Sequence, residues 1–207
     1  NLNLIDWNTS ITKLHDPNTN KKNKEKYMER LAFDEIFTNI LLMSSNRQKI
    51  NKIKKNRKVF NDTISKKIIE NFEFALTSDQ IKTIDEIKRD LASRKKMFRI
   101  LQGDVGSGKT ICAFISISNT IESGYQCALM APTDILAKQH FISANKTFKN
   151  TNIKIAFLSG KTLPKDRKVI LNDLKNGRID LIIGTHALFQ KKILFKKLGL
   201  AIIDEQH

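Results

Sequence analysis

The sequence predicts an α/β fold in which a parallel sheet flanked by helices follows a helical connector. Three observations support this prediction. Short apolar runs alternate with amphipathic stretches from residue 97 onward, a glycine-rich turn follows the first of those runs, and a long helical pattern precedes them. All-apolar strands that alternate with helices are typical of a parallel sheet covered on both faces.

The first part of the chain divides into a polar start and a long helical stretch. Residues 1–20 have few apolar anchors, and we expect them to be irregular. From about residue 21 to 56, apolar side chains recur at three- and four-residue steps, which predicts a helix with one face in a core. That stripe consists of Tyr27, Leu31, Phe33, Ile36, Phe37, Ile40 and Leu41.

Two shorter helices are predicted next. Asp62 or Thr63 can cap the first of them. Thr77 and Gln80 have the spacing of a capping box, which starts the second. The apolar stripes of these helices are Ile64, Ile68 and Ile69 in the first, and Ile81, Ile84, Ile87 and Leu91 in the second.

Strands and helices then alternate to the end of the chain. The apolar runs predict strands at 97–101, 127–130, 153–158, 181–183 and 200–203. Between them we expect helices from Lys109 to about Ser123, after Pro132-Thr133, and from Pro164 to Gly177. In such sheets ligands bind beyond the carboxyl ends of the strands, so the functional residues should lie there.

The chain carries a large excess of positive charge. It has 37 Lys and Arg residues against 21 Asp and Glu residues, a formal net charge of +16. The excess favours a phosphate-rich partner such as nucleic acid, although a composition rich in Lys, Asn and Ile is also what an AT-rich genome produces. One basic cluster is interpreted as a solvated face, with a phosphate-contacting edge as the alternative. It consists of Lys52, Lys54, Lys55, Arg57 and Lys58.

The sequence shows no sign of a membrane segment. No apolar run reaches the roughly 18–20 residues that span a bilayer, and the N-terminus lacks the basic start and apolar core of a signal peptide. Cys112 and Cys127 lie in apolar runs without metal-ligand spacing, so we expect two buried thiols in a reducing compartment. We therefore predict a cytoplasmic protein.

Both ends of the chain are unlike natural domain edges, which are normally polar and flexible. Residue 1 is Asn rather than Met, and His207 comes almost directly after a buried-looking strand. We interpret the chain as an internal piece of a longer protein.

A phosphate-binding loop follows the first predicted strand. Residues 103–110 read GDVGSGKT and match the pattern G-x-x-x-x-G-K-[ST] completely. Glycines let backbone N–H groups curl around the β- and γ-phosphates, Lys109 reaches the same oxygens, and Thr110 ligates Mg²⁺. The predicted cofactors are therefore ATP and Mg²⁺. The loop residues expected to bind them are Gly103, Gly106, Ser107, Gly108, Lys109 and Thr110.

An acidic pair follows the last predicted strand. Asp204 stands where a P-loop ATPase holds its Mg²⁺. Glu205 is expected to orient and deprotonate the attacking water, so that Glu205 and Lys109 are the predicted catalytic residues. An acidic pair at a strand end is a weak signal alone, but its place about a hundred residues after a P-loop makes it strong.

Two further segments follow strands at the same predicted edge. Pro132 and Thr133 come after one strand, and Gly184, Thr185 and His186 come after another. Hydroxyl groups and backbone amides in such positions suit contacts to the phosphates of a nucleic-acid strand. A pair of ordinary βα turns is the alternative at this point.

Together these motifs resemble the first RecA-like motor domain of superfamily 2 helicases and, more narrowly, the RecG family of bacterial ATP-dependent DNA helicases. The DEQH box at 204–207 is the narrowest marker of RecG. The matching segments are LT-x-x-Q at 76–80, GDVGSGKT at 103–110, LMAPTDILAKQH at 129–140, LSGK at 158–161, GTHALFQ at 184–190 and IIDEQH at 202–207, with LH-x-P at 14–17 and RLAFDEIF at 30–37 upstream.

The resemblance implies a division of the chain. Residues 1–20 would be the tail of an upstream wedge region, residues 21–75 the helical connector, and residues 76–207 the first motor domain, truncated at its C-terminus. The wedge and the second motor domain, with its arginine finger, would be missing. The piece alone should therefore bind ATP weakly and hydrolyse it barely.

The resemblance also implies residue roles and a substrate. Gln80 would contact adenine, Thr133 and the segment 184–186 would face DNA, and Gln206 and His207 would couple the ATP site to the DNA-binding cleft. The substrates of the family are branched DNA, namely stalled forks, Holliday junctions and R-loops.

Other functions stay open at this stage. The transcription-repair coupling translocase shares the GDVGSGKT loop, and the primosomal helicase is the other near alternative. The chain could also be a binding module that holds nucleotide without turnover. A non-helicase P-loop ATPase would show no effect of DNA on hydrolysis.

Overall fold

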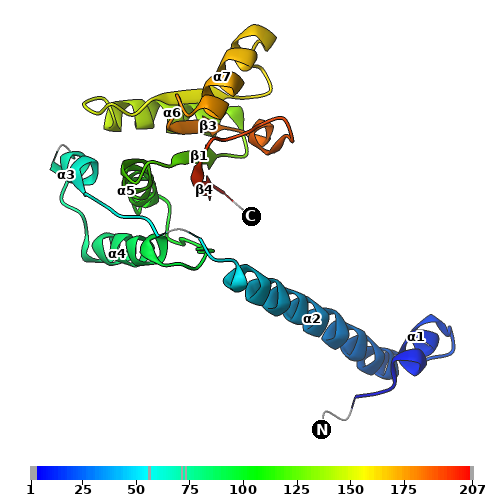
Figure 1. The fold of residues 1–207 in the computed structure, drawn as a ribbon. Helices are drawn as coiled ribbons and strands as arrows, with labels where there is room; N and C mark the ends of the chain where they lie inside the picture. Colours follow the sequence, from blue (N-terminus) through cyan, green and yellow to red (C-terminus); the bar gives the residue numbers. More distant parts are fainter. Residues whose placement is uncertain (1–3, 56, 71, 73, 206–207) are drawn as a thin grey trace. The chain divides into compact units, whose positions relative to one another are not determined.

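The structure is a computed structural model that describes residues 4–55, 57–70, 72 and 74–205, with the backbone alone at 50–52. Its internal contacts divide the chain into two compact units, residues 1–54 and residues 55–207. The helices and strands are labelled in Figure 1.

The first unit begins with a helix where we expected irregular chain. Helix α1 spans Trp7–His15, and the side chain of Asp6 caps it by accepting a hydrogen bond from the Thr9 N–H at 3.0 Å. The prediction for this segment was wrong because α1 has only nine residues and buries only Ser10, so no apolar stripe reveals it in the sequence. An Asp before a helix satisfies one of the unpaired N–H groups of the first turn.

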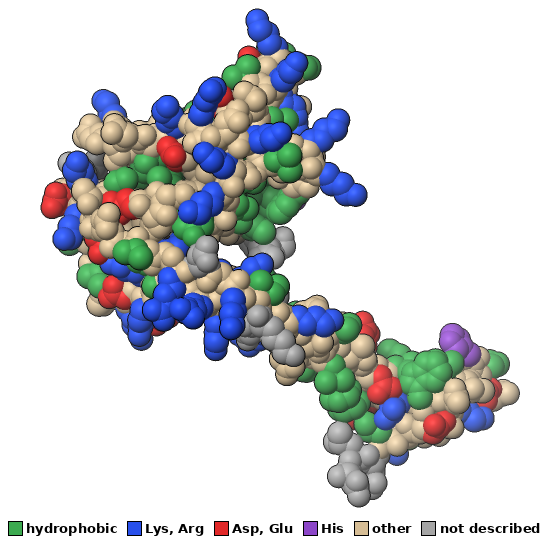
Figure 2. Space-filling view, in the orientation of Figure 1, with side chains coloured by type: hydrophobic (Ala, Val, Ile, Leu, Met, Phe, Trp, Pro, Cys, Tyr) green, Lys and Arg blue, Asp and Glu red, His purple; other side chains and the backbone are tan. Residues whose placement is uncertain are grey.

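Helix α2 spans Lys21–Lys52, as the helical periodicity predicts. The second half of its apolar stripe is not in a core, however, because Ile36, Phe37, Ile40 and Leu41 are 48–59% exposed. Figure 2 shows hydrophobic side chains at the surface of this helix. The expected core packing is therefore wrong for the second half of the stripe, whereas Tyr27, Leu31 and Phe33 in its first half are partly buried.

The second unit contains a four-stranded sheet and the helices around it. Most predicted elements appear within about three residues of the expected bounds, with one exception described below. The elements are α3 (Thr63–Glu70), α4 (Ser78–Ala92), α5 (Lys109–Glu122), β1 (Gln126–Met130), α6 (Asp134–Thr147), β2 (Ile155–Leu158), α7 (Pro164–Asn176), β3 (Leu181–Gly184), the 3-10 helix η1 (His186–Phe189) and β4 (Leu198–Ile203). Helix α3, which falls within the predicted connector, belongs to this unit.

The sheet is parallel throughout and has the strand order β2-β3-β1-β4. Leu129 in β1 pairs with Ile183 in β3 on one side and with Ile202 in β4 on the other. The carboxyl ends of the strands therefore meet at one edge of the sheet, which we call the carboxyl edge. This arrangement confirms the predicted parallel sheet.

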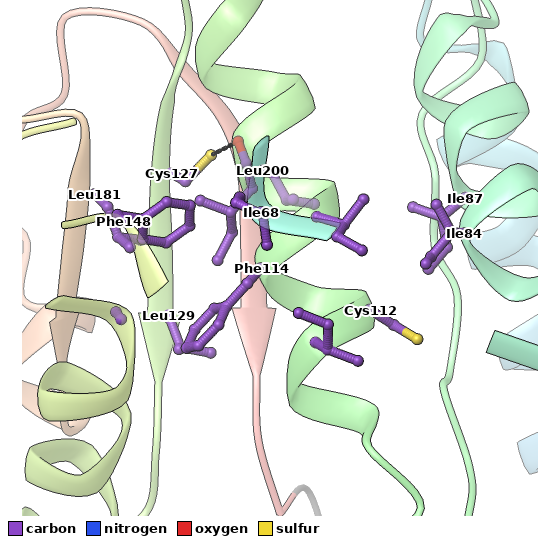
Figure 3. Packing of buried hydrophobic residues seen from close by; sticks show 14 of the residues in the cluster. Ile68, Ile84, Ile87, Cys112, Phe114, Cys127, Leu129, Phe148, Leu181 and Leu200 are labelled. Atoms are coloured by element: carbon purple, nitrogen blue, oxygen red, sulfur yellow. Dashed lines mark hydrogen bonds between the residues drawn. The ribbon is translucent and has the colours of Figure 1, made fainter. Parts of the chain in front are cut away.

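Alternate strand residues face two separate hydrophobic clusters. Cys127, Leu129 and Leu181 pack in one cluster with residues of α4, α5 and α6 (Figure 3). Ala128 and Ile182 pack in the other, which includes residues of α7. Each fully buried Leu or Ile side chain stabilises the fold by about 1.5–3 kcal/mol. Helices thus cover both faces, as the all-apolar strands predict.

The predicted strand at 97–101 is not a strand in the structure, so this prediction was wrong. The segment pairs with none of the four strands, and Phe98 and Ile100 are each 81% exposed. Arg99 lies between them and binds Glu86 and Asp90 of α4, at 2.7 and 2.8 Å. The apolar composition predicted a strand. A strand also needs a neighbouring strand with which it forms backbone hydrogen bonds, and the sequence of the segment alone does not show whether such a neighbour exists.

A buried amide joins three segments at the opposite edge, where the strands begin. Gln126 is only 5% exposed. Its Nε2 donates to the carbonyl oxygens of Leu174 and Ile179, at 2.9 and 2.7 Å, and its Oε1 accepts from the Lys197 N–H at 3.0 Å. The side chain therefore connects the end of α7 and the starts of β3 and β4 to β1. These hydrogen bonds also satisfy the polar atoms of an amide that burial would otherwise leave unpaired.

The two cysteines are buried and free, as expected. Burial raises the pKa of the Cys127 thiol, so it stays protonated and unreactive. No helix in the part of the chain that the structure describes is long and apolar enough to cross a membrane.

Candidate nucleotide and nucleic-acid site

Helix α5 places the phosphate-binding loop at the carboxyl edge of the sheet. The helix ends at Glu122 and β1 begins at Gln126, so a short turn reverses the chain. Because α5 also packs against β1 and β4, it runs antiparallel to them. Its first residue, Lys109, consequently lies near the edge where the strands end, and the loop precedes it there.

The loop has a shape that only glycine adopts easily. Gly106 and Gly108 have φ values of +82° and +79°, in the left-handed region. The Lys109 Nζ donates to the carbonyl oxygens of Gly103 and Asp104, at 2.6 and 2.8 Å. An ammonium group held by carbonyl oxygens can exchange them for phosphate oxygens, with which it forms stronger charge-assisted bonds. The loop is therefore suited to a polyphosphate.

Gln80 contacts this loop from the start of α4. The predicted capping box is confirmed, because Thr77 N donates to Gln80 Oε1 at 2.9 Å and Gln80 N donates to Thr77 Oγ1 at 3.2 Å. The Gln80 Nε2 also donates to the carbonyl oxygen of Ser107 at 3.0 Å. A Cβ at Gly108 would lie 2.3 Å from this Nε2. The structure thus brings Gln80 to the loop, while its contact with adenine stays a prediction.

The acidic pair follows β4 at the carboxyl edge. Asp204 N donates to the Met130 carbonyl oxygen at 2.8 Å, which continues the pairing of β4 with β1. The Asp204 Oδ2 lies 2.6 Å from Nε2 of His140 in α6. No hydrogen bond joins Asp204 to Lys109 or Thr110 in the described structure. The predicted metal ligands thus lie at one edge of the sheet without a direct hydrogen bond between them.

Glu205 has an unusual backbone conformation. Its φ is +51°, in the left-handed region, which costs a residue with a Cβ roughly 1–2 kcal/mol. Strain of this kind concentrates at functional sites, because the surrounding structure has to maintain it. The observation favours the predicted role of Glu205 without testing it. Gln206 and His207, the predicted coupling residues, lie outside the described residues.

The two segments that we expected to face DNA lie side by side. The Ala131 N–H donates to the Gly184 carbonyl oxygen at 3.0 Å. Thr133 is exposed, but its hydroxyl already caps α6 by accepting from the Leu136 N–H at 3.3 Å. Thr185 is buried at 9% exposure, so its side chain is poorly placed to meet a ligand.

The neighbouring residues differ in how they could take part. His186 is exposed and Pro132 is partly exposed, so both can be reached from solvent. Gly184 has a structural reason to be glycine, because a Cβ there would lie 1.9 Å from the Leu158 carbonyl oxygen.

Two residues of the basic cluster, Lys55 and Lys58, bind backbone carbonyl oxygens within the second unit. Lys58 is only 6% exposed, and its Nζ donates to the Gly199 carbonyl oxygen at 2.9 Å. Burial lowers its pKa to about 8. The Lys55 Nζ donates to the carbonyl oxygens of Asp90 and Leu91 at the end of α4. The solvated-face interpretation was wrong for Lys58, because burial depends on tertiary contacts that the cluster itself does not reveal.

Exposed Lys and Arg side chains are instead spread over the second unit (Figure 2). Arg57, from the same cluster, is among the exposed residues. The charge available to a phosphate-rich partner is therefore dispersed and not concentrated in this cluster.

A phosphate-binding loop, an acidic pair and two adjoining turns thus lie at one edge of the sheet, and known proteins share these features. Residues 77–207 match the DEAD/DEAH box helicase family. The chain belongs to this family. Its predicted resemblance to RecG is confirmed as well. The ATP-dependent DNA helicase RecG of Thermotoga maritima is 44% identical over 88% of this chain and 24% of its own length.

Other relatives of this DEAD/DEAH box helicase chain are also RecG proteins. RecG of Aquifex aeolicus is 40% identical over 99% of this chain and 26% of its own length. A solved structure of RecG bound to a three-way DNA junction matches with a TM-score of 0.79 and 41% identity. That match covers 96% of this chain and 27% of the solved one. The chain therefore spans about a quarter of the length of these relatives.

The residues fit the ATP and Mg²⁺ that this family implies. The left-handed glycines and Lys109 suit the phosphates, as described above. Thr110 and Asp204 are the two predicted metal ligands, and no group of three or more His, Cys, Asp or Glu side chains that could hold a metal occurs among the described residues.

One residue of the site was missed by sequence reasoning. His140 is the last residue of the segment 129–140 that resembles RecG, but the sequence assigned it no role. In the structure it contacts the predicted Mg²⁺ ligand Asp204. The available signal was its position on α6 between Ala137 and Ala144, which place one face of the helix against the sheet. Its partner lies 64 residues further along the chain, so only the fold brings them together.

Proposed function

We propose that this chain is the ATP-binding half of an ATP-dependent DNA helicase or translocase that remodels branched DNA, such as stalled forks, Holliday junctions and R-loops. The observation that carries the proposal is the gathering of the phosphate-binding loop, the acidic pair and two adjoining turns at one edge of the sheet. The relationship to RecG, including a structure of RecG on a three-way DNA junction, supports branched DNA as the substrate.

The proposed chemistry is ATP hydrolysis catalysed by residues at the carboxyl edge of the sheet. The loop amides and Lys109 would bind and orient the phosphates, Thr110 and Asp204 would hold Mg²⁺, and Glu205 would take the proton of the attacking water. When bound, Mg²⁺ neutralises charge on the phosphates. Gln80, already in contact with the loop, is the proposed adenine contact.

The proposed DNA contacts are Pro132, Thr133 and the segment 184–186. Of these, the exposed groups are the ones we expect to meet phosphates, together with backbone amides. A wedge domain before residue 1 and a second motor domain after residue 207 are the proposed missing parts of the same chain. Gln206 and His207 would link the two sites, in a cytoplasmic enzyme.

The test is the steady-state ATPase activity of the full-length protein. It is measured without DNA, with a three-way junction, and with linear duplex of the same length and base composition. We expect the junction to stimulate hydrolysis more than the duplex does. Lys109→Ala should abolish the activity, because charge-assisted hydrogen bonds contribute about 1.5–3 kcal/mol each.

Each other outcome favours a different function. Equal stimulation by junction and duplex would favour a translocase of the coupling or primosomal type. Hydrolysis that DNA does not change would indicate a non-helicase ATPase, and nucleotide binding without turnover would indicate a binding module. Unchanged turnover in Lys109→Ala would refute the assignment of the loop.

A further inference from the structure

The Asp204 carboxylate forms a hydrogen bond with His140, a residue to which the sequence motifs gave no role. His140 Nε2 and Asp204 Oδ2 are 2.6 Å apart. Both side chains are largely covered, at 16% exposure for His140 and 32% for Asp204. An ionised carboxylate only accepts hydrogen bonds, so the imidazole N–H is the donor. The bond uses one of the two carboxylate oxygens, and an ionised carboxylate can interact through both.

Helix α6 holds the imidazole in place. Ala137 and Ala144, one turn before and one turn after His140, are both fully buried. Between them, Phe141 packs on Phe157 of β2 with ring centroids 5.6 Å apart. The helix backbone at His140 is therefore fixed by packing on both sides, and the ring reaches Asp204 from a rigid base. A donor held in this way can select one carboxylate rotamer.

Asp204 itself is placed by its backbone and oriented by its side-chain partner. The hydrogen bond from Asp204 N to the Met130 carbonyl oxygen, at 2.8 Å, fixes where the residue lies relative to β1. It does not fix the direction of the carboxylate, because the side chain can still rotate. The His140 bond supplies that restraint. Partners of this kind behind a metal ligand typically change metal affinity or activity about 10–100-fold when they are removed.

We propose that His140 is a positioning residue that orients the Asp204 carboxylate toward the Mg²⁺ of the bound nucleotide. The inference rests on the proposed ATPase function, because that function makes Asp204 a metal ligand. It differs from a merely structural role, in which His140 would only attach α6 to the end of β4. A structural role predicts lower stability, whereas a positioning role predicts a changed dependence on Mg²⁺.

The experiment measures binding of a fluorescent ATP analogue to the full-length protein, as a function of Mg²⁺ concentration and also in EDTA. His140→Leu removes the donor and keeps similar bulk. His140→Gln keeps an N–H near the position of Nε2, and His140→Asn keeps an N–H that is too short to reach. Gln139→Ala, at an exposed neighbour on α6, is the matched control.

We expect His140→Leu and His140→Asn to raise the Mg²⁺ concentration at half-maximal binding about 10–100-fold, with nucleotide affinity in EDTA unchanged. His140→Gln should keep the Mg²⁺ concentration at half-maximal binding close to that of the wild-type protein, and Gln139→Ala should leave it unchanged. If His140→Leu fails to fold, the polar His140→Asn carries the same comparison. The thermal unfolding midpoint, measured in parallel, separates loss of stability from loss of Mg²⁺ affinity.

Two results would overturn the inference, and they are distinguishable. If the unchanged protein binds nucleotide independently of Mg²⁺, the proposed ATPase function fails and the role of His140 fails with it. If binding depends on Mg²⁺ but none of the His140 variants alters that dependence, only the role of His140 is refuted.

Discussion

Replacing Gly108 by Ala should weaken nucleotide binding through two separable effects. Gly108 has a φ of +79°, and a residue with a Cβ in this conformation costs roughly 1–2 kcal/mol. The new Cβ would also lie 2.3 Å from Gln80 Nε2, so the amide would have to move. Its hydrogen bond to Ser107, at 3.0 Å, would then be lost. Such a bond has a net value of about 0.5–1.5 kcal/mol.

Two other glycines separate the effects. Gly106 and Gly124 have φ values of +82° and +76°, and a Cβ at either would meet nothing within 4 Å. Gly106→Ala strains the loop without displacing Gln80, and should lower nucleotide affinity about 5–30-fold because the strained loop leaves its binding conformation. Gly108→Ala should lower it by a further factor of about 2–10. Gly124→Ala, away from the loop, should reduce stability by about 1–2 kcal/mol without changing affinity.

The assay is titration of the full-length protein with a fluorescent ATP analogue in saturating Mg²⁺, with thermal unfolding of each variant alongside. Equal affinities of Gly106→Ala and Gly108→Ala would show that the contact between Gln80 and the loop has no part in binding. Wild-type affinity in both variants would refute the loop as the nucleotide site.

Three other substitutions test separate parts of the structure. Glu205→Gln should keep Mg-ATP binding and stop hydrolysis, since the amide removes the base; normal turnover would make Glu205 structural. The folded pKa of Lys58, about 8, lies below its ordinary value of 10.5, so the unfolded chain binds the proton more tightly. Stability in urea should therefore rise from pH 8 to 10.5 relative to Lys58→Met, and parallel pH profiles would contradict this. Gly184→Ala should lower stability by about 1–3 kcal/mol, because its Cβ would force β2 and β3 apart; an unchanged melting temperature would exclude that close approach.

Local signals made most of the second unit predictable. Thr77 and Gln80 define the start of α4 within four consecutive residues, and Gly177 ends α7 in a left-handed conformation with a φ of +73°. The phosphate-binding loop is equally local, since all its groups lie within residues 103–110. Such features need no knowledge of the fold, because neighbours along the chain provide the whole interaction.

Features that depend on distant partners could not be predicted. The apolar segment at 97–101 lacks a ladder partner in the structure, and its own residues give no indication of this. Lys58 looked like part of a surface cluster until its bond to Gly199, 141 residues away, placed it in the interior. His140 gained a role only through Asp204. In each case the deciding contact is tertiary, which periodicity and composition do not record.

The buried amide of Gln126 has a consequence for how the domain can move. Its hydrogen bonds hold the amino ends of three strands and the end of α7 together, so this edge can open only when a large part of the unit unfolds. The opposite edge ends in loops that carry the candidate ATP and DNA contacts, and such loops can open locally at low free energy. Amide hydrogen exchange should therefore be slow at the start of each strand and faster beyond its end. The sheet would act as a fixed support, with the fluctuations that accompany ligand binding confined to one side.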